Sequence, residues 1–403
     1  MGCFKILIVF TVVILAIALL PGLPPDLEFT PFSTKEPMEL SGSMAPNDLL
    51  NGAERLFEGE IDAPEGLAVW NGTLYTGNRQ GDILKIVDGK MVKITNIGHP
   101  CEGYWEDRKC GRVVGINFDS KGYLYAADPY YGIYKINVET GKFIHLIKTD
   151  VPIEGKTVRV ANSVVVAKDG TVYWTSSICT NPGVDVEDAV VAIFADGNGR
   201  LFKYDPIEKT NKVLIDKMNF ANGLALSPNE DFIVVSETVQ CRLLRYWLKG
   251  PRQGSADVFI DSLPGIPDNM HLIKGGLFEV SLAQPRTKQQ PLPIDTLAPY
   301  PLVRRFIARV LYYLELPFQT IQEIYPNTYT GIFTHWFNNF DKLQPLLHQW
   351  ICIVQIDQNG KIVRTLQSTD KKVTAVSDMR LINGHYYFGS AHNMYLGRVK
   401  FGE

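Results

Sequence analysis

A short phrase recurs along this chain, and its spacing constrains the fold more than any other feature. A polar or acidic residue heads a short β-strand in most copies, a turn follows, and a second strand ends on aromatic or aliphatic residues. The copies begin at Glu65, Val114, Asn162, Asn222, Asp268 and Asp378. The first five are about 45–60 residues apart, the range of propeller blades rather than of helical repeats. The sequence therefore predicts an all-β fold, a six-bladed β-propeller.

The runs between these phrases are typical of blade strands. Residues 72–77 and 122–127, for example, are rich in β-branched and aromatic residues and are bounded by Gly, Asp or Asn. Residues 60–280 show almost no helical periodicity. A strand near 55–60 is expected to complete the last blade and close the ring, because closure removes exposed sheet edges.

The residues at the heads of the phrases form the candidate site. The innermost strands of a propeller surround one central channel. We therefore expect convergence on its axis of Glu65, Asn162, Asn222, Asp268 and Asn269. Two carboxylates and three amide oxygens make an oxygen-rich site, for which Ca2+ is the expected cofactor. The alternative is that these residues only cap turns, as Asn and Asp often do.

The fifth blade is expected to contain an insertion. Residues 285–349 are Pro-rich at first and then helical. An apolar face with helical spacing extends over 302–314, and Arg304, Arg305 and Arg309 lie off it. Three interpretations remain: a helix packed on the propeller rim, a lid over the channel mouth, or a surface that dips into a membrane.

The N-terminus carries an apolar run from Ile6 to Leu20 in which Thr11 is the only polar residue. Such a run, of about 15 residues, is short for a membrane span of about 20 and suits the hydrophobic region of a signal peptide. No small-x-small cleavage pattern follows it. We therefore expect an uncleaved signal-anchor, a single-pass type II protein with the propeller outside the cytosol. Cleavage and secretion is the alternative.

Together these features predict a signal-anchor over 1–25, a linker over 26–50 and a propeller over 51–403 that includes the insertion. The hydrophobic fraction is 45% and the charged fraction 21%, as in an ordinary globular protein. The formal net charge is −3, which gives no reason to expect a nucleic-acid partner.

A compartment outside the cytosol favours disulfide formation, and Cys101 and Cys110 flank a short loop in which a bridge is expected. Metal binding with His99 is the alternative, although no second pair of ligands completes a zinc site. Asn71 opens the only N-glycosylation sequon, and it lies on a predicted turn where a glycan would be exposed.

Several longer motifs carry a family resemblance: Cys110-Gly-Arg-Val-Val-Gly-Ile, Ala127-Asp-Pro-Tyr-Tyr-Gly-Ile, Pro152-Ile-Glu-Gly-Lys, Asn222-Gly-Leu-Ala-Leu-Ser-Pro and Leu263-Pro-Gly-Ile-Pro-Asp-Asn. With them the chain resembles the strictosidine synthase-like family over 50–401, most closely its animal branch, the adipocyte plasma membrane-associated proteins. The resemblance implies a six-bladed propeller related to paraoxonases and gluconolactonases, which hold a catalytic calcium in the channel. The five residues proposed above match that calcium shell.

Two departures limit what the resemblance implies. Plant strictosidine synthases use a glutamate in the last blade, whereas residues 359–402 contain none. Strictosidine synthase activity is therefore not expected. Paraoxonases place a His before a Gly-Ile pair in the second blade, and here that position is Val114.

Three functions remain, in this order. The first is a membrane-anchored, Ca2+-dependent esterase or lactonase, arylesterase-like, acting on a small apolar ester. Asp268 would be its nucleophile or water-orienting carboxylate, and His271 is a second catalytic candidate because strand alternation puts it on the same face as Asn269. The second is a non-catalytic propeller with structural calcium, in which Asp268 only binds the metal and His271 is structural. The third is a synthase reaction on another amine and aldehyde. The membrane is the expected partner, through the anchor and the helix over 302–314.

Overall fold

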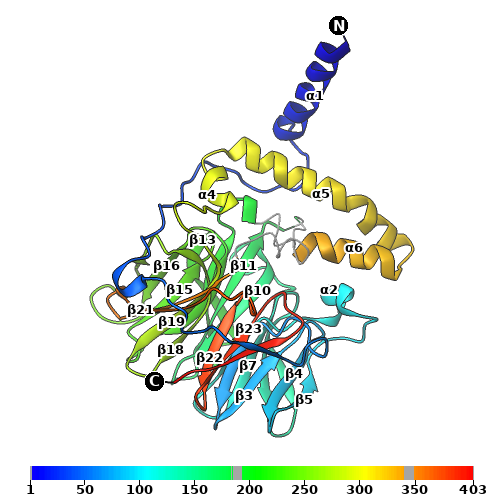
Figure 1. Cartoon of the computed structure of the whole chain (residues 1–403). Coiled ribbons are helices and arrows are strands. Elements are labelled where there is room, and N and C mark those ends of the chain that lie inside the picture. The colour runs from blue at the N-terminus through cyan, green and yellow to red at the C-terminus, as the bar shows by residue number, and fades with distance from the viewer. Residues whose placement is uncertain (1, 183, 185–192, 340–348, 403) are drawn as a thin grey trace.

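The computed structural model describes residues 2–182, 184, 193–339 and 349–402. Its body contains six antiparallel sheets of four strands each, which follow one another along the chain. Each sheet is one blade, and the six blades form a propeller (Figure 1). The predicted six-bladed all-β fold is confirmed.

The first three blades consist of β2 (Leu67–Trp70), β3 (Thr73–Gly77), β4 (Asp82–Val87) and β5 (Lys90–Asn96); β6 (Gly115–Phe118), β7 (Tyr123–Asp128), β8 (Gly132–Asn137) and β9 (Phe143–Lys148); and β10 (Thr157–Val166), β11 (Val172–Thr180), β12 (Gly199–Asp205) and β13 (Thr210–Met218). The next two consist of β14 (Ala221–Leu226), β15 (Phe232–Glu237), β16 (Arg242–Trp247) and β17 (Ala256–Ile260); and β18 (Gly265–Ile273), β19 (Leu277–Pro285), β20 (Ile351–Ile356) and β21 (Ile362–Ser368).

The sixth blade joins the two ends of the propeller. It contains β22 (Asp378–Ile382), β23 (His385–Gly389), β24 (Leu396–Lys400) and, from the beginning of the chain, β1 (Glu54–Leu56). Strand β1 pairs antiparallel with β24, with Glu54 opposite Arg398. The expected closing strand is therefore present, and it fixes the ring by backbone hydrogen bonds.

The core lies between neighbouring blades, because each sheet buries apolar residues on both faces. Phe232 of blade four packs at 6.1 Å between ring centroids from Phe278 of blade five. Near the channel the inner strands approach so closely that a Cβ on Gly223 would lie 2.5 Å from the carbonyl oxygen of Asp268. Only glycine fits there, which explains the Asn-Gly pair at the head of the fourth blade.

The helices gather at one end of the propeller (Figure 1). Between β19 and β20, neighbours in one sheet, the chain forms α4 (Pro293–Leu297), α5 (Pro301–Ile324) and α6 (Thr328–Asn339). Between β5 of blade one and β6 of blade two, η2 (Tyr104–Glu106) leads into α2 (Asp107–Cys110). Trp105 of η2 faces Gly331 of α6, where a Cβ would lie 2.7 Å from the indole. Helix α6 thus packs against the segment between β5 and β6.

The N-terminal apolar run forms α1 (Gly2–Leu19), which points away from the propeller (Figure 1). Within the described residues, no helix combines the length and the hydropathy required to cross a membrane. Residues 26–50, expected to be a linker, lie along the body and include η1 (Gly42–Met44). Leu50 is fully buried, and the amide of Met38 donates to the carbonyl oxygen of Ser262.

Candidate metal centre in the central channel

Three β-bulges coincide with four of the candidate ligands. In β10 the register shifts between Ala161 and Val164, so that two residues stand against one residue of β11. The same shift occurs in β14 across 222–223 and in β18 across 268–269. A bulge re-aims side chains and is common near active sites. In β18 it explains how two consecutive residues of the candidate set contribute to one site, which strict alternation would prevent.

The residue opposite each bulge, on the second strand of the blade, carries a hydroxyl group. Each hydroxyl donates a hydrogen bond to a backbone carbonyl of the following blade. Thr175 donates to the carbonyl oxygen of Asn222 at 2.8 Å, and Ser236 donates to that of Asp268 at 2.8 Å. Ser281 donates to the carbonyl oxygen of Val376, at the start of the sixth blade, at 2.6 Å. The first two bonds fix the backbone at Asn222 and Asp268, two of the candidate ligands.

Oxygen atoms without a hydrogen-bond donor collect at these bulges. The Oδ1 atoms of Asn162, Asn222 and Asp268 are completely buried and have no hydrogen-bond partner, and neither does Nδ2 of Asn269. Because Asn amide oxygen and nitrogen are interchangeable by a 180° rotation, Asn269 can present its oxygen instead. Buried polar atoms are almost always paired, so such a set fits a bound cation.

Two carboxylates complete the set. Burial raises the pKa of Glu65, although Arg112 opposes the rise by donating from Nη2 to Oε2 at 3.0 Å. Burial and then the charge of Glu65 raise the pKa of Asp268 well above its usual range. The two carboxylates therefore repel each other in the channel, and a divalent cation between them would remove that repulsion.

The residues present fit a hard cation such as Ca2+, which takes six to eight oxygen ligands. The described part of the chain contains no group of three or more His, Cys, Asp and Glu side chains placed to hold a metal. The channel set differs from such groups because it combines two carboxylates with three amides. Side-chain amide oxygens are ligands that Ca2+ accepts readily.

Arg112 and a contact between α2 and α6 lie close to this site. Arg112 also donates to the carbonyl oxygen of Ala391 at 2.8 Å. Nearby, Nδ1 of His335 on α6 lies 3.6 Å from Oδ2 of Asp107. Burial alone would raise the pKa of Asp107, but His335, Arg112 and then Arg79 outweigh it and lower the pKa to about 2.

His271 lies farther along β18 than the candidate ligands. Its Nε2 lies 2.5 Å from Oδ1 of Asp378, whose Oδ2 accepts the backbone amide of Leu67 at 2.7 Å. Burial and repulsion from Arg380 lower the pKa of His271, although Asp378 opposes the shift. The ring is therefore neutral near pH 7 and donates from Nε2. The catalytic roles of Asp268 and His271 stay predictions.

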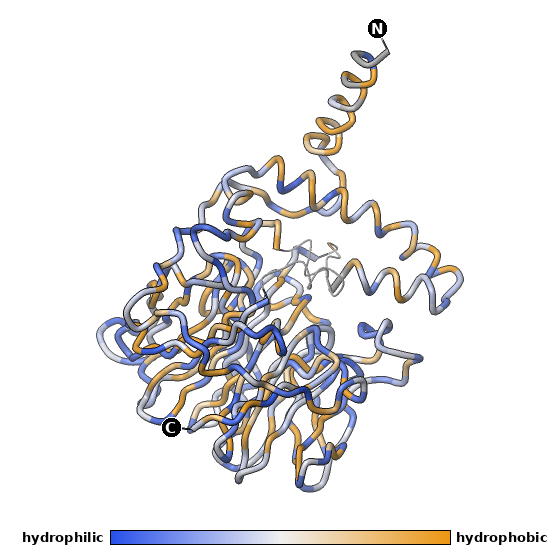
Figure 2. The backbone as a smooth tube through the Cα atoms, viewed as in Figure 1, coloured by the Kyte–Doolittle hydropathy of each residue, from blue (hydrophilic) through white to orange (hydrophobic). Residues whose placement is uncertain are grey.

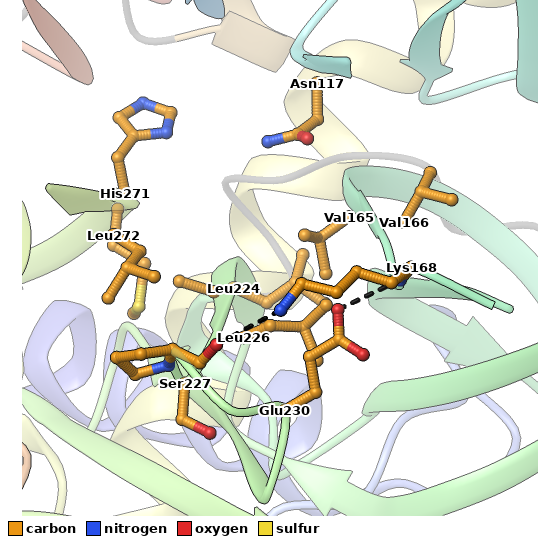
Figure 3. Close-up of a pocket in the computed structure, with 13 residues that line it drawn as sticks. Asn117, Val165, Val166, Lys168, Leu224, Leu226, Ser227, Glu230, His271 and Leu272 are labelled. Atoms are coloured by element: carbon orange, nitrogen blue, oxygen red, sulfur yellow. Dashed lines mark hydrogen bonds between the residues drawn. The ribbon is translucent and has the colours of Figure 1, made fainter. Parts of the chain in front are cut away.

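A cavity of about 240 Å³ lies where the inner strands β10, β14 and β18 end (Figure 3). His271 and Asn117 border it on one side, and Lys168 and Glu230 on the other. The backbone amide of Lys168 donates to Oε1 of Glu230 at 2.9 Å. His271 therefore faces this cavity, whereas the candidate ligands lie toward the helical end.

The predicted disulfide is confirmed: Cys101 and Cys110 are bonded, with 5.3 Å between their Cα atoms. Metal binding by Cys101 together with His99 is thereby excluded. Three other cysteines are free and buried: Cys179, Cys241 and Cys352. Asn71 is exposed on the turn between β2 and β3 with a φ of 47°, and Gly72 follows with a φ of 74°. Positive φ at both positions is typical of a two-residue hairpin turn.

Sequence reasoning missed several residues of this region. Asp378 was recognised as the head of a blade but not as the partner of His271. Arg112 and the Asp107–His335 contact carry no local pattern, because their partners are distant in sequence. The hydroxyl residues opposite the bulges did carry a signal, since Thr175, Ser236 and Ser281 each follow an aromatic or valine residue in a second strand.

Comparison with known proteins identifies the family. The family profile described as "Strictosidine synthase" matches residues 162–251, and "Strictosidine synthase-like, N-terminal" matches residues 42–86. The adipocyte plasma membrane-associated protein Hemomucin of Drosophila melanogaster is 39% identical over 97% of this chain and 68% of its own length. The chain belongs to the strictosidine synthase-like family, in its branch of adipocyte plasma membrane-associated proteins.

Solved structures confirm the fold of this family member. A gluconolactonase from Xanthomonas campestris is similar with a TM-score of 0.54 at 15% identity, covering 95% of this chain and 99% of that one. A calcium-binding protein, regucalcin from Agrobacterium tumefaciens, is similar with a TM-score of 0.50 at 11% identity, covering 87% and 95%. At such identities the likeness establishes the propeller fold alone.

Proposed function

We propose that the channel binds Ca2+ through Glu65, Asn162, Asn222, Asp268 and Asn269. The observation that carries the proposal is the cluster of buried oxygens without donors, one each on Asn162, Asn222 and Asp268. An unpaired buried polar atom is costly, and a cation bound by these three oxygens and by Glu65 would satisfy them and offset the repulsion between the two carboxylates. Five protein ligands leave coordination positions open for water or substrate.

We further propose that this centre hydrolyses a small apolar ester or lactone. A bound Ca2+ supplies a Lewis acid that polarises a carbonyl oxygen and stabilises the negative charge developing on it. In this chain, Asp268 holds a carboxylate beside that position, where it can orient a water or attack the carbonyl carbon. Arg112 orients Glu65 through its hydrogen bond and opposes the rise in the pKa of this carboxyl that burial causes. The buried site excludes bulk water, which strengthens these interactions.

The names of similar propellers support this choice of chemistry. One is titled a gluconolactonase and another a calcium-binding protein. The test is hydrolysis of a panel of aryl esters and lactones by the full chain, with Ca2+ and with a chelator. We expect chelator-sensitive turnover that Asp268→Ala abolishes and Asp257→Asn, on an outer strand, leaves intact. Turnover that survives both chelation and Asp268→Ala would contradict the proposal.

A non-catalytic propeller with structural calcium is the second candidate. It is favoured by the position of Val114, where paraoxonases carry a His, and by the absence of glutamate from 359–402. In this case the ligands, which come from four blades, would hold the ring together. Chelation would then lower stability in a protein that hydrolyses none of the panel.

For the location, we propose that α1 is an uncleaved anchor in a type II orientation. Most of its described side chains are apolar and exposed, among them Ile6, Val9 and Val12. Figure 2 shows α1 as hydrophobic along most of its length. The relatives named plasma membrane-associated proteins support the same location. Cleavage and secretion is the alternative, and intact-mass measurement of protein from a secretory host distinguishes the two.

A further inference from the structure

Helix α5 buries several of its charged residues and exposes several of its apolar residues. Arg304, Arg309 and Glu315 are buried, whereas Leu302 and Leu314 are 48% and 52% exposed. A helix that covers a protein core shows the opposite arrangement. The side chains of Leu302 and Leu314 therefore do not pack on the propeller rim, whereas Leu311 of the same helix packs against Phe29, Ala195 and Ala308.

The inward orientation of the charged residues is fixed by specific contacts. Arg304 donates from Nη1 to the carbonyl oxygen of Phe194 at 2.6 Å and from Nη2 to that of Thr30, and it lies 3.4 Å from Asp196. Rotating α5 to bury its apolar face would break these bonds and leave a guanidinium without its partners. The exposed apolar face is thus a stable feature of the fold.

Further exposed apolar side chains lie at the end of α5, in the turn that follows it and in α6. We call this set of side chains the outward surface, and its members are Leu302, Val303, Leu314, Ile321, Ile324, Tyr325, Tyr329 and Ile332. The most exposed are Tyr329 at 86% and Ile324 at 80%. Among the charged residues of α5, only Glu323 is exposed. Large apolar patches of this kind mark an interaction site.

Helix α1 is attached to the same element. Arg309 of α5 donates from Nη1 to the carbonyl oxygen of Ile17 at 2.6 Å. Figure 1 shows α1 leaving the molecule from the side of α5 that faces away from the propeller. Whatever apolar medium surrounds α1 therefore lies next to the outward surface as well.

We infer that the outward surface lies on a lipid bilayer, the one that α1 enters. The inference rests on the anchor proposed above and adds a second, in-plane contact. A helix with one apolar face lies in the membrane interface, and tyrosines are enriched at that depth. The outward surface, as far as the structure describes it, carries no cluster of basic residues. We therefore expect it to bind uncharged lipid without a requirement for anionic headgroups. A second copy of the chain would satisfy α5 but would leave the apolar sides of α1 in water.

The test uses the full chain in vesicles of neutral phosphatidylcholine. Cysteine is introduced singly at Ile324, Tyr329, Val13 and Ile207, and each variant is labelled with an environment-sensitive fluorophore. Ile207 is the matched control, because it is 90% exposed on the turn between β12 and β13, at the end of the propeller away from α5. The parent chain, treated identically, gives the background from native thiols, and a thermal melt verifies that each variant is folded.

We expect a nitroxide placed near the lipid headgroups to quench the labels at 324 and 329 at least two-fold more than the label at 207. The label at 13 tests the anchor separately. Quenching at 13 without quenching at 324 and 329 would leave the anchor in place and overturn the inference. A blue shift at 324 that grows with protein concentration, without lipid quenching, would assign the surface to a second copy and overturn it too.

Discussion

The imidazole of His271 on blade five donates to the carboxylate of Asp378 on blade six, with 2.5 Å between Nε2 and Oδ1. The same carboxylate accepts the backbone amides of Leu67 on blade one and Met379. One buried side chain therefore connects three blades at the point where the ring closes. A buried hydrogen-bonding group that loses its partner lowers the stability of the fold by about 1–3 kcal/mol.

We expect Asp378→Asn to lower the free energy of unfolding by about 1–3 kcal/mol, because an amide nitrogen would replace one accepting oxygen. Glu54→Gln is the matched control: Glu54 pairs with Arg398 across β1 and β24, but the pair is largely exposed and contributes about 0–1 kcal/mol. Urea unfolding at saturating Ca2+ measures both. Equal losses in the two variants would contradict a special role for Asp378.

Calcium should stabilise the native propeller. A ligand that binds only the folded state adds about 2.7 kcal/mol at a concentration of 100 times its Kd. We expect the melting temperature to rise with Ca2+, to fall with chelator, and to be insensitive to both in Asp268→Ala. Asp257→Asn, which alters the outer pair with Arg245, should keep the full calcium response. If the melting temperature of the parent chain is the same with Ca2+ and with chelator, the proposed metal site is contradicted.

Asp107 gives a pH dependence with a defined sign. Its folded-state pKa is about 2, below its ordinary value of 3.8, because His335, Arg112 and Arg79 together outweigh the effect of burial. The carboxylate therefore stabilises the fold fully above about pH 4, and this contribution disappears as the pH falls toward 2. The shift corresponds to about 2 kcal/mol.

The measurement is urea unfolding of Asp107→Asn and the parent chain at several pH values. We expect the difference between them to be about 2 kcal/mol at pH 6 and to shrink below pH 4. Glu102→Gln, an exposed carboxylate in the same loop, should show little effect at any pH. A difference that grows on acidification would show that the sign is wrong.

Asn71 should carry a glycan when the chain is made in a secretory host. The side chain is exposed on a tight turn, at the end of the propeller away from α5. A glycosidase should increase the gel mobility of the parent chain and leave Asn71→Gln unchanged. Protein that does not shift, despite passing through the secretory pathway, would argue against a luminal or extracellular propeller.

Much of the candidate site could be predicted because blade spacing is a long-range pattern with a local signature. The phrase at Asn222 and the phrase at Asp268 are recognisable in isolation, and a propeller brings all inner strands to one axis. The bulges at Asn162 and Asn269 were not predictable, because a bulge depends on how two strands pair. The orientation of α5 was predicted incompletely for a similar reason.

The sequence by itself determined the six-bladed propeller, its closing strand, the bond between Cys101 and Cys110, and the helical spacing over 302–314. Each follows from periodicity, strand propensity or short-range geometry, which are properties of neighbouring residues. Only the tertiary structure decided that Asp378 holds His271, that His335 reaches Asp107, and that α5 faces outward with its apolar side. Those outcomes depend on contacts between residues far apart in the chain, such as Arg304 with Thr30, and no local pattern records which partner a side chain will meet.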